Sequence, residues 1–513
     1  MNSGSSGFQS LLKQNGILLL LGAAAALFHI LFNGQYGFHR DELDILMNAR
    51  QLDWGYVAYP PITPFAARIL LEIFGNSLRG LRLFSALGQG IVVVLAGLMA
   101  RDLYPAASQR NTRRAEVMSA VAVFIAPTAL TAGTMIQYLS FDYLWWVLIA
   151  FFFVRLLKTE DPRYWLGVGA AIGMGMLTKF TVIFFVAGLV AAVLLTTNRR
   201  YLRSPWLWAG AGLALLIYLP NLIWQVQNDF ISLEFLSAIH ARDIAWGRTS
   251  GFLPEQLYIS ANPFTLPFWI IGLGVCLFAP SFKRFRAVGI TFLVTFGLLW
   301  IAQSRSYYVG PAYAMLLAAG AAGLDAWLVG KGKLLRRSMQ VAAWGLLLVG
   351  LVVGAVLVKP IAPINSGLWE ITSSVSGEAV EMIGWDDLTA QVAEIYQTIP
   401  ENERGRTVIL AGNYGEAGAL DLYGSEYDLP PVISGSNSLW QRGYGNFDPE
   451  TVILVGFERG DANNFFMNCQ SAGQVSNRYG VKNEETTSHT TIFVCRNPRH
   501  PWAEMWPEMQ SFQ

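Results

Sequence analysis

Residues 164–197 read YWLGVGAAIGMGMLTKFTVIFFVAGLVAAVLLTT, and Lys179 is the only charged residue in this apolar stretch. Because a helix needs about 20 apolar residues to cross a bilayer, the stretch is long enough for two spans joined by a tight turn at 178–180. The whole chain shares this character: 53% of its 513 residues are hydrophobic and 14% are charged, against about 25% charged in soluble domains. The sequence therefore predicts a polytopic α-helical membrane protein.

Eleven segments of the chain are apolar enough to be predicted as membrane spans. They cover approximately residues 16–33, 81–100, 115–132, 142–157, 164–178, 180–197, 205–224, 263–280, 287–302, 309–329 and 339–358. The first span stays apolar through Leu31 and Phe32, where the polar start of a mature protein would already follow a cleaved signal peptide. We therefore expect an uncleaved anchor and not a signal peptide.

Basic residues in the short loops predict the orientation, because cytoplasmic loops are enriched in Lys and Arg. With eleven spans, five basic clusters fall on one side together with Lys13, and we assign that side to the cytoplasm. The clusters are Arg110/Arg113/Arg114, Arg155/Lys158/Arg163, Arg199/Arg200/Arg203, Lys283/Arg284/Arg286 and Lys331/Lys333/Arg336/Arg337. The loops 34–80, 133–141, 225–262 and 303–308, the turn 178–180 and everything after residue 358 are then extracytoplasmic.

The tail after residue 358 has a different composition, with more Asn, Asp, Glu and Gly and no apolar run of membrane length. Its helix-like segment at 386–397 precedes strand-like segments at 407–411, 451–456 and 490–495, which is typical of a small α/β domain. We therefore predict two domains. A transmembrane domain covers residues 1–358, including the first external loop, and an extracytoplasmic α/β domain covers residues 359–513.

Three cysteines are too few for a disulfide framework or a cysteine-rich zinc site. Cys469 and Cys495 both lie in the predicted extracytoplasmic domain, where disulfides persist. From the sequence, a bond between them and a pair of free thiols are equally open. Cys276 falls inside a predicted span, where we expect it only to pack.

The first external loop begins with three carboxylates, Asp41, Glu42 and Asp44, within four residues. Neighbouring, partly buried carboxylates raise one another's pKa, which suits a general base. The alternative is a solvated acidic start of a loop. The richness of the loop in Trp, Tyr, Leu and Pro argues against a solvated connection, and its segments 43–53 and 62–74 have the pattern of short amphipathic helices lying in the membrane interface.

Three further positions on the extracytoplasmic side are candidates for chemistry. Asp142 stands at the mouth of an aromatic span, where a carboxylate is costly unless it is paired, although a helix N-cap explains it equally well. Lys179 either snorkels to the lipid headgroups or binds a lipid phosphate. Arg305, followed by Tyr307 and Tyr308, offers bidentate hydrogen bonds to a phosphate or forms an ordinary aromatic belt with a basic anchor.

Several function classes are excluded by what the sequence lacks. The 36 basic and 35 acidic residues leave a net charge of +1, so we expect no nucleic-acid partner. The chain has no Walker A loop, Rossmann glycine fingerprint or His-Glu-x-x-His motif, and its five histidines lack ligand spacing. A transporter or lipid flippase and a structural assembly subunit remain as alternatives. The absence of visible repeats and the gathering of charges at one membrane face favour an enzyme with a one-sided active site.

Six motifs, in order along residues 15–320, resemble the bacterial branch of the dolichyl-phosphate-mannose–protein mannosyltransferase superfamily. These C-type (GT-C) glycosyltransferases include the lipid A aminoarabinose transferases. The motifs are Asp41-Glu42, Gly55-Tyr56, Tyr59-Pro60-Pro61, Asp142, Leu177-Thr178-Lys179-Phe180 and Tyr307-Tyr308-Val309-Gly310-Pro311. The tail segment Ala411–Leu420, AGNYGEAGAL, also resembles the tails of many such bacterial proteins.

The resemblance implies that a sugar is transferred, with inversion, from a polyprenyl phosphate to an extracytoplasmic lipid, polysaccharide or protein acceptor. It also implies a bacterial plasma (inner) membrane location. Because phosphate leaves as a stable anion, the reaction needs a base for the acceptor hydroxyl and cations beside the phosphate. By motif position, Asp41 is the candidate base, Glu42 its support and Asp142 the second acidic residue. The candidates for the donor phosphate are Lys179, Arg305, Tyr307, Tyr308 and Arg40.

The chain departs from the aminoarabinose transferases in the candidate substrate loop Tyr59-Pro60-Pro61. Those enzymes have Lys before the Pro-Pro pair, where this chain has Tyr59. One phosphate contact is therefore missing, and we do not transfer the aminoarabinose substrate to this chain. Whether a divalent metal assists the reaction stays open, since two carboxylates suffice to hold one and some relatives work without it.

Overall fold

The computed structural model describes residues 3–105, 112–445 and 448–513, so Arg110 of the first basic cluster lies outside the described residues. The chain divides into two compact units. The first contains Met1–Asn33, Arg82–Ile223 and Arg242–Lys359, and the second contains Gly34–Leu81, Trp224–Ala241 and Pro360–Gln513. The first external loop, predicted to be part of the transmembrane domain, therefore groups with the tail.

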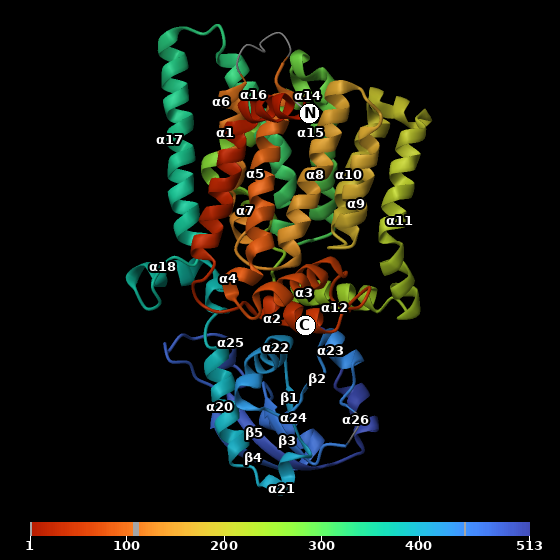
Figure 1. The fold of residues 1–513 in the computed structure, drawn as a ribbon, viewed down its shortest axis with the longest axis vertical. Coiled ribbons are helices and arrows are strands. Elements are labelled where there is room, and N and C mark those ends of the chain that lie inside the picture. The colour runs from red at the N-terminus through yellow and green to blue at the C-terminus, as the bar shows by residue number, and fades with distance from the viewer. Residues whose placement is uncertain (1–2, 106–111, 446–447) are drawn as a thin grey trace. The chain divides into compact units, whose positions relative to one another are not determined.

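The first unit is a bundle of helices that run side by side (Figure 1). Each of the eleven predicted spans falls on one helix or on two successive ones. The long elements are α1 (Ser3–Phe32), α5 (Leu83–Leu103), α6 (Arg113–Phe124), α7 (Pro127–Ala132), α8 (Tyr138–Thr159), α9 (Tyr164–Met176), α10 (Val182–Leu195), α11 (Pro205–Gln227), α14 (Leu266–Phe278), α15 (Arg286–Ile301), α16 (Tyr313–Leu328) and α17 (Lys333–Val358). Shorter turns connect them: η2 (Thr197–Arg203), α13 (Phe252–Glu255), η3 (Gln256–Ser260), η4 (Pro263–Thr265), η5 (Pro280–Phe285) and η6 (Ser306–Ala312).

By length and composition, fewer helices qualify as membrane spans than the eleven segments predicted. Within the described residues, seven helices are long and apolar enough to cross a membrane, or up to nine if two bent helix pairs each count as one span. The two remaining predictions fall on shorter helices. The segment 115–132 is divided because Pro127 starts a new helix and Ala126 before it is extended, and the segment 164–178 is the 13-residue α9.

Small residues allow α16 to occupy the interior of the bundle. Its side chains are almost all buried, and its sequence is rich in Ala and Gly. A Cβ atom on Gly320 would clash with the carbonyl of Phe268 in α14, and one on Gly272 of α14 would clash with the carbonyl of Leu316. The two backbones therefore pack directly on each other, as helices with small residues do in membranes.

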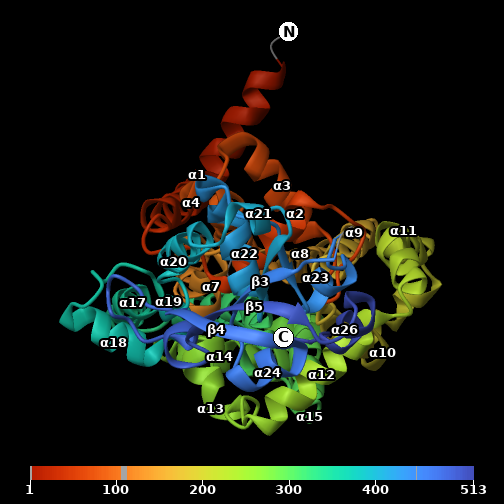
Figure 2. The same cartoon turned by 90° about the horizontal axis from the view of Figure 1, so that it is seen from below.

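The tail forms a small α/β domain, as predicted. Its five strands lie in the order β2-β1-β3-β5-β4, with β1 parallel to β2 and β3, and β5 antiparallel to β3 and β4. Figure 2 looks onto β3, β5 and β4. The elements are α18 (Gly367–Val375), α19 (Gly377–Val380), α20 (Trp385–Gln397), α21 (Glu401–Arg404), β1 (Thr407–Ala411), α22 (Tyr414–Tyr423), η7 (Gly424–Tyr427), β2 (Val432–Ser434), α23 (Asn437–Gln441), β3 (Thr451–Val455), α24 (Arg459–Phe465), β4 (Phe466–Gln474), α25 (Glu484–Thr487), β5 (Thr491–Pro498) and α26 (Trp502–Glu508).

The first external loop contributes α2 (Arg40–Arg50), α3 (Ile62–Phe74) and α4 (Leu78–Leu81) to the second unit, and most of α12 (Ile231–Ala245) also belongs there. The two predicted short helices are thus present, but they differ in their surroundings. Leu43, Ile45 and Leu46 of α2 are buried, and α2 lies beside α22 of the tail (Figures 1 and 2). Of these two helices, α3 is the one that keeps large apolar side chains exposed, at Ile69 and Ile73 among others, as an interfacial helix would.

Cys469 and Cys495 form a disulfide in the structure. They are directly opposite each other on the antiparallel strands β4 and β5, with 4.1 Å between their Cα atoms. The bond therefore ties the edge strand β4 to its neighbour β5. Cys276 is buried in α14 with a free thiol.

We expect thiol labelling of the unfolded, unreduced protein to modify Cys276 alone, because the other two sulfurs are bonded to each other. After reduction, all three cysteines should react. Mass spectrometry of the labelled peptides checks this directly. Labelling of Cys469 and Cys495 without reductant would show that the bond does not form.

Candidate active site

Lys179 lies in the loop between α9 and α10, at the predicted turn. Its Nζ lies over three tyrosine rings, 4.1 Å from the centroid of Tyr308, 4.7 Å from that of Tyr138 and 5.0 Å from that of Tyr307. Each such contact stabilises a cation by about 0.5–2 kcal/mol. The half-buried ammonium is therefore held among aromatic faces, and the structure brings together three of the predicted donor-phosphate residues.

Asp142 is a buried carboxylate in the same unit, and the N-cap interpretation of it is wrong. Helix α8 begins earlier, at Tyr138, with Gln137 as its N-cap. The Asp142 side chain is 2% exposed, accepts a hydrogen bond from Trp146 Nε1 at 3.0 Å, and interacts electrostatically with Lys179. Thr181, in the α9–α10 loop, donates a longer hydrogen bond of 3.5 Å to it. Asp142 and Lys179 therefore lie close enough to interact electrostatically.

Arg305 precedes η6 and forms a bidentate ion pair that the sequence analysis did not predict. Its Nε and Nη2 atoms donate to the two carboxylate oxygens of Asp243, at 2.6 Å and 2.7 Å. Asp243 is buried and also lies 3.6 Å from Arg248. The pair fixes the guanidinium plane of Arg305 and offsets part of its charge. Asp243 belongs to no recognisable motif, so the sequence held no signal for this contact.

In the second unit, Asp41 and Glu42 form the first turn of α2. His39 is the N-cap: its Nδ1 accepts the Asp41 N–H at 3.2 Å, and its own N–H donates to Glu42 Oε2 at 2.9 Å. Glu42 thus closes a capping box, which is a structural task. The Asp41 carboxylate accepts a hydrogen bond of 2.9 Å from the hydroxyl of Tyr414.

The two residues before Asp41 are paired with acidic side chains of the tail. His39 Nε2 lies 3.1 Å from Glu378 and 3.2 Å from Glu381. Because Nδ1 accepts the Asp41 N–H, the ring hydrogen is on Nε2, where it faces these two glutamates. Arg40 forms an ion pair with Glu484, and its guanidinium lies 5.2 Å from the centre of the Tyr414 ring. Glu484 therefore offsets part of the charge of Arg40.

The candidate substrate loop has its side chains in the interior. Pro60-Pro61 is buried, and the Tyr59 hydroxyl donates to Asp44 while it accepts from Asn48 Nδ2 at 2.6 Å. Burial raises the pKa of Asp44 to about 6, although the Tyr59 hydrogen bond opposes this. Arg442 of the tail donates to Asn48, so a cation reaches this network without the lysine of the aminoarabinose transferases. A contact of Tyr59, Pro60 or Pro61 with substrate stays a prediction.

Glu416 caps α22, and its buried carboxyl makes the stability of the fold depend on pH. Its carboxylate accepts hydrogen bonds from the backbone N–H groups of Gly412 and Asn413, both at 3.2 Å. Burial, followed by repulsion from Glu485, raises the pKa of Glu416 to about 8. Because folding raises the pKa of Glu416, this carboxyl stabilises the fold most when the pH is below its pKa in the unfolded chain. The stabilisation is lost as the pH rises through about 8.

We therefore expect Glu416→Gln, which keeps the capping acceptor, to melt at a higher temperature than the wild type at pH 9. The two proteins should converge near pH 5, where the wild-type carboxyl is protonated in the folded state. Thermal unfolding in detergent at both pH values checks this, with the exposed Glu426→Gln as the matched control. A difference between Glu416→Gln and wild type that does not change with pH would contradict it.

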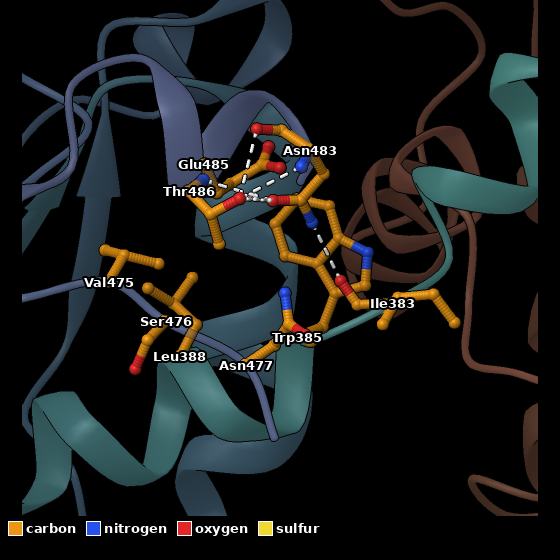
Figure 3. A pocket seen from close by; sticks show the side chains of 10 residues that line it. Ile383, Trp385, Leu388, Val475, Ser476, Asn477, Asn483, Glu485 and Thr486 are labelled. Atoms are coloured by element: carbon orange, nitrogen blue, oxygen red, sulfur yellow. Dashed lines mark hydrogen bonds between the residues drawn. The ribbon is translucent and has the colours of Figure 1, made fainter. Parts of the chain in front are cut away.

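A small hollow lies in the tail domain (Figure 3). It is lined by Ile383, Gly384, Trp385, Leu388, Val475, Ser476, Asn477, Asn483, Glu485 and Thr486. None of these residues was predicted to act in the reaction. In the described parts of the chain, no three His, Cys, Asp or Glu side chains gather as a metal-binding group.

The sequence and the fold are similar to those of known glycosyltransferases. Residues 58–224 match the family model of dolichyl-phosphate-mannose-protein mannosyltransferase. The chain is 33% identical over 157 residues to undecaprenyl phosphate-alpha-4-amino-4-deoxy-L-arabinose arabinosyl transferase 1 of Pseudomonas fluorescens, covering 29% of this chain and 27% of that one. It is 26% identical over 254 residues to lipid A galacturonosyltransferase RgtD of Rhizobium johnstonii, covering 49% of this chain and 51% of that one. The chain thus spans at most about half the length of these curated relatives.

The fold likeness covers nearly the whole chain. The structure of ArnT from Cupriavidus metallidurans in the apo state matches with a TM-score of 0.59 at 14% identity, over 96% of this chain and 98% of that one. The structure of the same protein bound to undecaprenyl phosphate matches with a TM-score of 0.57 at 16% identity, over 94% and 98%. The chain therefore resembles GT-C glycosyltransferases of this superfamily, in sequence over part of its length and in fold over almost all of it.

Proposed function

We propose that this protein transfers a sugar from a polyprenyl phosphate to an extracytoplasmic acceptor, with inversion at the anomeric carbon. The observation that carries this proposal is the cluster of Lys179, Asp142 and three tyrosines. Asp142, Tyr138 and Lys179 all lie within the segment that matches the mannosyltransferase family model. The relatives reported above are named as transferases, which supports an enzyme over a transporter.

The largest change in charge during the reaction occurs on the leaving phosphate. When the bond between the anomeric carbon and the phosphate oxygen breaks, both bonding electrons stay with the phosphate. We assign Lys179 to offset this charge, with Arg305 and the hydroxyls of Tyr307 and Tyr308 as further donors. Such groups act best when they are held in place before the reaction. The aromatic contacts of Lys179 and the Asp243 ion pair of Arg305 provide that order.

The acceptor hydroxyl needs a base, and we assign this role to Asp41. Its carboxylate takes the hydroxyl proton while the oxygen attacks the anomeric carbon on the face opposite the phosphate, which inverts the configuration. Glu42 supports Asp41 by capping the turn that carries it. Asp142 is the second acidic residue of the proposed site, where it interacts electrostatically with Lys179.

For the cellular setting, we propose a bacterial plasma membrane with the N-terminus in the cytoplasm and the tail domain outside. The basic clusters of the short loops support this orientation. As the acceptor class we propose a lipid, because one relative is named a lipid A galacturonosyltransferase. A polysaccharide or protein acceptor is a separate outcome of the experiment below.

The test uses purified protein in detergent with a panel of polyprenyl-phosphate sugars and lipid, polysaccharide or peptide acceptors. Mass spectrometry measures free polyprenyl phosphate, and NMR of the product reads the anomeric configuration. We expect one donor to be consumed with inversion and with a lipid acceptor. Retention of configuration would contradict the single displacement, and no release from any donor with any acceptor would contradict the transferase assignment.

A further inference from the structure

The tail domain holds the first turn of α2, the turn that carries the proposed base. Each of the three residues at this turn has a partner in the tail. His39 is bound by Glu378 and Glu381, Arg40 by Glu484, and Asp41 by Tyr414. These contacts join residues more than 300 positions apart in the sequence. The motif AGNYGEAGAL, whose role the sequence left open, supplies the partner of Asp41.

Two glycines of this motif bring α22 close to α2. A Cβ atom on Gly418 would lie 2.7 Å from the backbone carbon of Leu43, and one on Gly415 would lie 2.9 Å from the Cβ atom of Arg40. Real Cβ contacts are not this short, so only glycine permits this approach. The close packing places the ring of Tyr414, the first residue of α22, against the first turn of α2.

The third contact, from Glu484, is also fixed locally. Glu484 is the first residue of α25, and its N-cap Asn483 is held from two sides, as Figure 3 shows. Asn483 Nδ2 donates to the carbonyl of Ile383 at 2.9 Å, and its Oδ1 accepts the N–H of Thr486 at 3.1 Å. The partner of Arg40 is therefore part of the rigid tail domain.

Tyr414 is suited to be a permanent hydrogen-bond donor. Desolvation of its hydroxyl and the neighbouring Asp41 carboxylate raise its pKa well above the ordinary value. The phenol consequently keeps its proton at every pH at which an enzyme of this kind works. A hydroxyl that always donates restricts the rotation of the carboxylate that accepts from it.

We propose that Tyr414 is a positioning residue, whose hydroxyl aims the Asp41 carboxylate at the acceptor, so that the C-terminal domain is an integral part of the catalytic apparatus. This inference rests on the proposed function of Asp41. Misplacing a catalytic group by about 1 Å costs up to a hundredfold in rate, so the orientation of a single carboxylate matters. Tyr414 takes no proton and touches no reacting atom in this account.

The test compares Tyr414→Phe with the wild type in the donor-release assay. We expect kcat to fall about 10- to 100-fold, while KM for the lipid-linked donor and the apparent melting temperature stay unchanged. Tyr427→Phe, at an exposed tyrosine of the same domain, is the matched control and should behave as wild type. Gly418→Ala, which pushes α22 away from Leu43, should lower kcat in the same way.

A double-mutant cycle separates positioning from a merely structural role. If Tyr414 acts through Asp41, adding Tyr414→Phe to Asp41→Asn should cause no further loss of the residual rate. An additive loss, or wild-type kcat in Tyr414→Phe, would overturn the positioning role while leaving the proposed function intact. No turnover by the wild type with any donor would overturn the proposed function, and this inference with it.

Discussion

Replacing Asp41 by asparagine should lower the rate of sugar transfer by about 10²- to 10⁴-fold, the usual contribution of a general base. Asparagine has nearly the same shape and still accepts the hydrogen bond from the Tyr414 hydroxyl, but its amide cannot take up the acceptor proton. Expression and the apparent melting temperature should therefore stay close to those of the wild type. The initial rate of polyprenyl phosphate release at saturating acceptor is the measurement.

The matched control for this variant is Asp428→Asn. Asp428 is exposed and adopts a left-handed backbone conformation, which asparagine tolerates as well as aspartate does. It should release polyprenyl phosphate at the wild-type rate. Full activity in Asp41→Asn would remove Asp41 from the role of base and direct attention to Asp44, the buried carboxyl of the same helix whose pKa is about 6.

Replacing Lys179 by alanine should raise KM for the lipid-linked donor about 10- to 100-fold, as expected for loss of a hydrogen bond to a charged group. The three tyrosine rings remain, but their faces carry negative electrostatic potential and do not replace the missing cation. Because the phosphate is already anionic in the bound donor, KM should change more than kcat. We expect kcat to fall as well, since the negative charge on the phosphate grows as it leaves. Initial rates over a range of donor concentrations in mixed micelles separate the two parameters.

Lys331→Ala provides the control, because Lys331 is exposed and lies over a single aromatic ring, 4.7 Å from that of Trp327. It tests whether any loss in Lys179→Ala comes merely from removing a cation–aromatic contact. An unchanged KM in Lys179→Ala would show that this lysine only anchors its loop at the lipid headgroups.

Much of the fold is predictable because its signals are local. Apolar segments of membrane length mark the helices, and the break at Lys179 marks the α9–α10 loop. Strands β1, β3 and β5 are apolar and were predicted, whereas β2 has three residues and β4 is a polar edge strand without alternation. Pro127, which divides the third predicted span into α6 and α7, is a local signal as well. Counting apolar residues does not detect it.

The site residues that belong to sequence motifs were predictable. Their partners from distant parts of the sequence were not. Lys179, Tyr307 and Tyr308 were each singled out, and the structure places them together. Asp243 lies 62 residues before its partner Arg305, and Tyr414 lies 373 residues after its partner Asp41. Pairing over such separations depends on the packing of helices, which no pattern of neighbouring residues specifies.

The central claim is that the protein removes the sugar from a polyprenyl-phosphate donor rather than moving the intact lipid. Proteoliposomes with a donor labelled on both the sugar and the lipid, containing either wild type or Asp41→Asn, test it most directly. We predict that the wild type releases free polyprenyl phosphate when acceptor is added and that Asp41→Asn does not. Movement of the doubly labelled lipid across the bilayer with its sugar still attached, to the same extent in both proteins, would contradict the account.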